Sequence, residues 1–177
     1  LVAVDEYAGR GYQQIKLYGA IAPEWVEPIA KRTHELGMRL SGHIPMTGTT
    51  EQAIRSGYDE VQHFIYMWLN FADHPITSEL TFNTARIARN TPADSADIRG
   101  LEQLFLDQDA ALDPTLTIYS ELLASKPGEL KRSYRAMSER LPLQTARAAR
   151  SGPLLAPEGI EKGDMNELFV QALQVVG

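Results

Sequence analysis

Three side chains that could bind a metal ion are separated from one another in the sequence by about the length of one strand–helix repeat. Lys16, His43 and His63 each lie near the end of a segment that is predicted to be a β-strand. Neutral imidazoles are common ligands of divalent metals such as Zn²⁺. A lysine ammonium has no free lone pair at neutral pH, so Lys16 would need to be carbamylated by CO₂ to offer a ligand oxygen.

Two other interpretations of these residues are open. A desolvated Lys16 amine could form a Schiff base with a carbonyl substrate, as in an aldolase. Alternatively, the histidines could be structural and the chain could be a non-catalytic binding or assembly module. Borohydride trapping of a carbonyl substrate would support the Schiff base, whereas bound metal would argue against both interpretations.

The elements that must position these side chains are alternating strands and helices. Strands are predicted over residues 12–18, 38–44 and 58–64, with helices over 23–36 and 49–57 between them. This alternation indicates right-handed βαβ units and a parallel sheet, hence the α/β class. The carboxyl ends of parallel strands converge on one rim, where the active sites of such folds lie. The three side chains could therefore meet although they are distant in sequence.

The rest of the chain is predicted to be mostly helical. A fourth strand is expected over residues 111–118, although Pro114 within it cannot donate to a sheet ladder. Further helices are expected over residues 1–10, 97–109 and 126–151 and from Asp164 onward.

Composition narrows the function classes. The 177 residues carry 17 Lys and Arg against 23 Asp and Glu, a formal charge of −6, and no cysteine. The absence of cysteine excludes disulfides and thiolate metal sites, and the net acidity argues against nucleic acid as a partner. No apolar run approaches the ~20 residues that span a bilayer, so no membrane insertion is expected. The first ten residues predict no signal peptide, and nothing in the sequence indicates a compartment.

Three short motifs carry a family resemblance. The segments IKLY, SGHIP and VQHF, within Gly11–Met67, resemble the amidohydrolase superfamily, closest to its imidazolonepropionase-like and Xaa-Pro dipeptidase-like branch. The segment Asp113-Pro114-Thr115-Leu116 is similar to that family's seventh strand. The resemblance implies that residues 1–177 form a single piece of a (β/α)8 TIM barrel, about strands four to seven with their helices. A closed barrel takes ~200–250 residues, so the N-terminal strands and the eighth strand would be lacking.

The same resemblance implies a function and a set of ligands. Lys16 would be the carboxylated lysine that bridges two divalent metals, zinc by this resemblance, and His43 and His63 would bind the second metal. The activity implied is hydrolysis of an amide, cyclic amide or dipeptide by metal-activated water. The family's HxH pair and its general-base aspartate are not found in this sequence. No catalytic residue is therefore assigned, and the isolated piece is expected to be inactive.

Substrate and partner contacts are predicted at fewer positions. Tyr18, two residues after Lys16, and His74, before a proline, are candidate substrate contacts. His34 is expected to be solvated on a helix surface. An aromatic group of Tyr66, Trp68 and Phe71 could be core or could line a pocket. Because an open arc of barrel leaves strand edges exposed, association into a homo-oligomer through those edges is expected.

Overall fold

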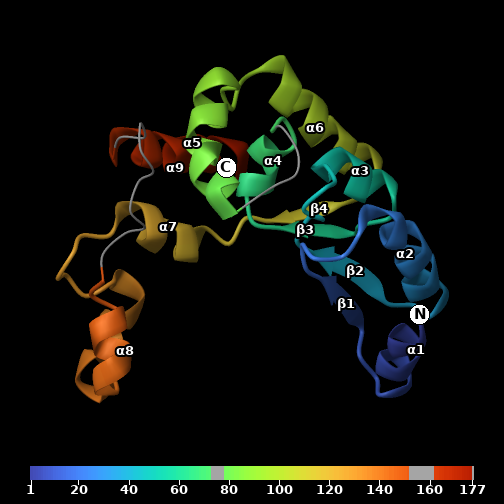
Figure 1. Cartoon of the computed structure of the whole chain (residues 1–177), viewed down its shortest axis with the longest axis horizontal. Coiled ribbons are helices and arrows are strands. Elements are labelled where there is room, and N and C mark those ends of the chain that lie inside the picture. Colours follow the sequence, from blue (N-terminus) through green and yellow to red (C-terminus); the bar gives the residue numbers. More distant parts are fainter. Residues whose placement is uncertain (73–77, 152–161, 177) are drawn as a thin grey trace.

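The computed structural model describes residues 1–72, 78–151 and 162–176. This part of the chain is built around a parallel sheet of four strands in the order β1-β2-β3-β4, which confirms the predicted βαβ succession (Figure 1). The strands are β1 (Gln14–Leu17), β2 (Arg39–Gly42), β3 (Glu60–Gln62) and β4 (Ala111–Asp113).

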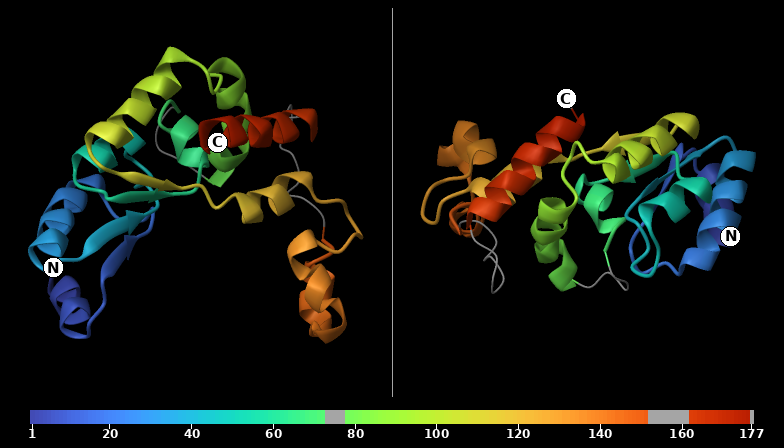
Figure 2. Two further views of the ribbon diagram at one scale, coloured as in Figure 1. Left: turned by 180° about the vertical axis from the view of Figure 1, so that it is seen from behind. Right: turned by 90° about the horizontal axis from the view of Figure 1, so that it is seen from above.

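Helices connect the strands and cover the sheet. In Figure 1, α2, α3 and α6 lie along one side of the sheet, and α8 lies far from it. Figure 2 shows α9 beside α5, although the two helices are distant in sequence. The α-helices are α1 (Val2–Gly9), α2 (Val26–Glu35), α3 (Thr50–Arg55), α4 (Ile65–Leu69), α5 (Ser78–Asn90), α6 (Ala96–Asp107), α7 (Leu116–Ala124), α8 (Leu143–Ala148) and α9 (Lys162–Val176), and the 3₁₀ helices are η1 (Pro23–Trp25) and η2 (Arg132–Arg140).

The first strand follows the alternation of its side chains. Ile15 and Leu17 are buried, whereas Gln14 and Lys16 are exposed on the opposite face. This is the two-residue period expected of a strand with one apolar face. The alternation in the sequence thus determines which face of β1 packs in the core, and it leaves the Lys16 side chain exposed on the other face.

Two predicted helix starts are confirmed with adjustments. The α3 helix begins with a capping box, in which the Thr49 hydroxyl accepts from Gln52 N at 3.1 Å and the Gln52 side chain accepts from Thr49 N at 3.0 Å. The α2 helix begins at Val26, after the 3₁₀ turn that Pro23 opens. Pro28 therefore falls in the first turn of α2, where a backbone N–H has no partner within the helix.

The predicted fourth strand over residues 111–118 is too long. β4 ends at Asp113, and α7 begins at Leu116. Pro114 cannot extend the ladder, and Thr115 has left-handed backbone angles of φ 48° and ψ 39° that turn the chain into α7. The carboxyl end of β4 consequently lies beside that of β3, with a helix leading away.

The region 126–151, which is predicted to be helical, is helical only in part. The structure has η2, with a break in helical geometry at Met137, and then the short α8, which starts after Pro142. The α5 helix was not predicted.

The aromatic group after β3 is largely core, because Tyr66 and Trp68 in α4 are at most 8% exposed, although Phe71 is 36% exposed. Among the described residues, no helix has both the length and the hydropathy to cross a membrane.

Candidate metal and substrate site

The strongest chemical feature of the molecule is a pair of converging imidazoles. His43 follows β2, His63 follows β3, and their Nε2 atoms lie 2.9 Å apart. Two nitrogen ligands of one tetrahedral zinc, each with a bond of ~2.0–2.1 Å, lie about 3.3 Å apart. A small opening of this pair would therefore allow both nitrogens to bind a single metal ion.

The backbone, and not strand alternation, aims these two rings. Gly42 has a φ of 134° and His63 a φ of 79°, both in the left-handed half of the φ range. A Cβ on Gly42 would clash with the carbonyl oxygen of Leu17 and lie 2.8 Å from its nitrogen. Only glycine fits at this position, and the chain leaves β2 there so that His43 N still donates to Leu17 O at 3.0 Å.

Lys16 occupies the same rim on the neighbouring strand. In the sheet register it pairs with Ser41, two residues before His43. Its Nζ lies 5.0 Å from the centre of the Tyr18 ring, and that ring lies 4.5 Å from the His43 ring. The structure thus brings the three predicted ligands and Tyr18 to one rim.

Both histidines are held in the neutral form. Burial lowers the pKa of His43 to about 4, with further lowering by the neighbouring His63 and Lys16. Burial and Lys16 also lower the pKa of His63, and Asp113 opposes this effect. At pH 7 each ring therefore has one nitrogen with a free lone pair, which is the state that a metal requires.

One site residue was missed as a functional candidate at the sequence level. The Thr115 hydroxyl lies 2.7 Å from Nδ1 of His63, and Thr115 N donates to a carboxylate oxygen of Asp113 at 3.2 Å. Both residues stand in the DPTL segment, which was predicted to be strand. A strand over these residues gives no reason to connect Thr115 with His63. The observed turn at Thr115 is what directs its hydroxyl to the histidine.

Tyrosines close the buried side of the imidazole pair. The ring centres of Tyr66 and Tyr119 lie 6.3 and 5.8 Å from that of His63, and both side chains are at most 9% exposed. Burial raises the pKa of Tyr66 to about 12 and raises that of Tyr119 as well, so both phenols stay protonated. Tyr58 donates to the backbone oxygen of His43 at 2.8 Å, which fixes the chain at that ligand.

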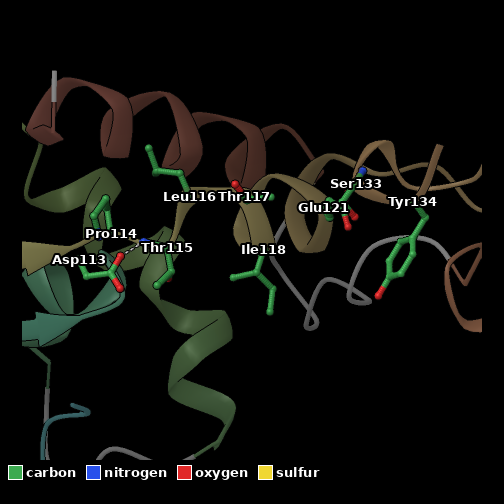
Figure 3. Close-up of a pocket in the computed structure, with 9 residues that line it drawn as sticks. All are labelled: Asp113, Pro114, Thr115, Leu116, Thr117, Ile118, Glu121, Ser133 and Tyr134. Atoms are coloured by element: carbon green, nitrogen blue, oxygen red, sulfur yellow. Dashed lines mark hydrogen bonds between the residues drawn. The ribbon is translucent and has the colours of Figure 1, made fainter. Parts of the chain in front are cut away.

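An open groove of about 590 Å³ adjoins the site (Figure 3). Asp113 and Thr115 form the end nearest the histidines, and α7 and the start of η2 contribute its other walls, including Glu121 and Tyr134. The two carboxylates are its charged lining groups, and no described lysine or arginine lines it. The groove is large enough for a small molecule.

The donor set fits a metal only with the help of lysine. Among the described residues, no group of three or more His, Cys, Asp or Glu side chains is placed to hold a metal ion. Two neutral imidazoles and a carbamate oxygen on Lys16 would make three ligands, the number that a catalytic zinc site uses.

The histidine on α2 takes no part in this pair. His34 contacts Asp59 at 2.9 Å, and its side chain is 43% exposed, which confirms that it is partly solvated. His74, the second predicted substrate contact, lies outside the described residues.

Comparison of the chain with protein-family models, with curated proteins and with solved structures finds no match.

Proposed function

We propose that this chain provides a metal-binding and substrate-binding part of a hydrolase that acts on carbon–nitrogen bonds. The observation that carries the proposal is the 2.9 Å approach of the Nε2 atoms of His43 and His63 at the carboxyl ends of adjacent parallel strands. The family resemblance of the surrounding motifs supports the reaction class. A carbamylated Lys16 would complete the ligand set with an oxygen.

A divalent metal, zinc by the nature of these donors, would polarise an amide carbonyl and lower the pKa of a water when bound. The chain's own residues have separate tasks. His43 and His63 offer neutral Nε2 lone pairs, and the buried tyrosines exclude water from one side of them. Tyr18 is 59% exposed at the rim and would contact an incoming substrate.

The groove beside Thr115 would hold the rest of the substrate, a small amide or dipeptide. Its carboxylates, Asp113 and Glu121, favour a neutral or cationic substrate group over an anionic one, because like charges in a partly desolvated groove repel. The resemblance assigns the general base to an aspartate outside these residues. The decisive test therefore measures metal binding rather than turnover.

The test loads the purified chain with zinc and bicarbonate and measures zinc content and affinity by competition with a chromophoric chelator. We expect one zinc per chain, and a loss of about 100-fold or more in affinity for His43→Gln and His63→Gln because a direct ligand is removed. His34→Gln is the matched control and should bind like the native chain. A ¹³C-carbamate signal from labelled bicarbonate should appear in the native chain and disappear in Lys16→Gln.

The proposal fails if the native chain binds no zinc, or if His34→Gln weakens binding as much as the other two changes. Trapping of a carbonyl substrate on Lys16 by borohydride, without bound metal, would favour the Schiff-base alternative. Absence of both metal and trapping would leave the binding-module interpretation.

A further inference from the structure

Thr115 makes a contact that its position in the fold does not require. It is the N-cap residue of α7, where a threonine hydroxyl ordinarily accepts a hydrogen bond from the helix backbone. The structure has no such bond, and the hydroxyl oxygen lies instead 2.7 Å from Nδ1 of His63. These residues are 52 positions apart in the sequence, so the contact exists only because β3 and β4 are neighbours.

The backbone adopts unfavourable conformations on both sides of this contact. His63 has a φ of 79° and Thr115 a φ of 48°, and left-handed angles are uncommon for any residue other than glycine and most unfavourable for a β-branched one. Strain of this kind persists where the surrounding structure holds it, and it is concentrated at functional sites. Here the hydrogen bonds from His63 N to Asp113 O at 2.8 Å and from Phe64 N to Pro114 O at 3.3 Å hold it.

The contact links the direction of one hydrogen bond to the tautomer of His63, because a threonine hydroxyl can either accept from Nδ1–H or donate to a bare Nδ1. A neutral imidazole has one N–H and one lone pair. If Nδ1–H donates to Thr115 Oγ1, then Nε2 of His63 keeps its lone pair and accepts from Nε2–H of His43 at 2.9 Å in the metal-free chain. In the other tautomer, Nε2 carries the proton and cannot bind a metal, while the Thr115 hydroxyl would have to donate.

We infer that Thr115 is a positioning residue that fixes the Nδ1–H tautomer and the ring orientation of His63, so that its Nε2 is presented to a ligand shared with His43. This inference rests on the proposed function for the identity of that ligand as a metal. The tautomer itself is a property of the metal-free chain, and it is measured without any metal.

The experiment compares three chains labelled with ¹⁵N in histidine, all treated with a chelator, by long-range ¹H–¹⁵N correlation at a pH where the rings are neutral. The native chain and Thr115→Ser should both show the Nδ1–H form of His63. Thr115→Val has the same shape and the same β-branching but no hydroxyl, so His63 should shift toward the Nε2–H form that a histidine side chain favours in water. Zinc affinity should then fall 10–100-fold in Thr115→Val and stay within a few-fold in Thr115→Ser.

Either of two results would overturn the inference: an Nε2–H tautomer in the native chain, or a Thr115→Val chain with the native tautomer and zinc affinity. The native-chain spectrum decides the first point even if Thr115→Val does not fold. If the tautomers behave as expected but no chain binds zinc, the proposed function fails and the positioning role stands. If zinc binding depends on both histidines but not on the hydroxyl, the proposed function stands and the positioning role fails.

Discussion

His43 and His63 show how neighbouring side chains set the state of a single group. Burial and the nearby charge of Lys16 lower the pKa of both imidazoles, to about 4 for His43. This environment keeps the two rings neutral, with lone pairs that a metal could use, and it makes their protonation unfavourable. The metal-free protein should therefore become less stable as the rings are driven to charge.

The direction of this pH effect follows from proton linkage. In the unfolded chain histidine titrates at its ordinary value, near 6.5, whereas folded His43 titrates at about 4. Between these values the unfolded state binds more protons, so the free energy of unfolding falls as the pH falls from about 6.5 to about 4, with no further loss from this group below that. Urea unfolding with a chelator at several pH values should show this slope reduced in His43→Asn. An unchanged slope in His43→Asn would contradict the prediction.

At the scale of the elements, the ends of the strands decide the chemistry. β2 ends at Gly42 and β3 ends at Gln62, and each is followed directly by a histidine. Left-handed turns at Gly42 and His63 then take the place of strand alternation in directing the rings. The lengths of β2 and β3 therefore matter for the site, because each ring would point in a different direction if the regular strand continued for one more residue.

The turn at Gly42 gives a direct stability prediction. Gly42→Ala should destabilise the fold by more than about 2 kcal/mol, because a Cβ would meet the backbone of Leu17 and the φ of 134° is unfavourable for alanine. Gly100→Ala, within α6, is the control, since nothing lies within 4 Å of its added Cβ. That change should stabilise the helix by about 0.5–1 kcal/mol. Denaturant unfolding measures both changes, and a Gly42→Ala chain of native stability would refute the argument.

At the scale of the whole molecule, the described sheet has two open edges, formed by β1 and β4. Backbone groups at such edges are free to pair with another strand. The oxygen of Gln13, just before β1, accepts from Arg39 N, and that of Leu17 accepts from His43 N, at 3.0 Å each. The N–H of Gln14, between them, therefore points away from β2. We therefore keep the prediction that the chain associates into a homo-oligomer through these edges.

A pair of variants tests that association at the β1 edge. Gln14→Pro and Gln14→Ala both lose the hydrogen bond that the Gln14 side chain makes to the Ser41 hydroxyl. Only Gln14→Pro also removes the outward N–H. Light scattering after size exclusion should show an oligomer for the native chain and Gln14→Ala, and a shift toward monomer for Gln14→Pro. A native monomer would refute association, and identical oligomers in both variants would exclude this edge as the interface.

The sequence by itself determined the alternation of strands and helices, the buried face of β1 and the cap of α3, because each depends on side-chain periods or contacts a few residues apart. It also placed Lys16, His43 and His63 at strand ends, which is enough to predict a shared rim. It did not predict the turn that replaces the second half of the fourth strand, since left-handed angles at His63 and Thr115 run against the local preferences of those residues.

Only the tertiary structure decided how the site is assembled. The 2.9 Å between the two Nε2 atoms and the contact of Thr115 with His63 join residues 20 and 52 positions apart. Such distances depend on the order and register of the parallel strands, and on the packing that holds strained backbone in place. A local sequence pattern specifies neither the strand order and register nor this packing. The identities of the site residues could therefore be predicted from the sequence, but their mutual geometry could not.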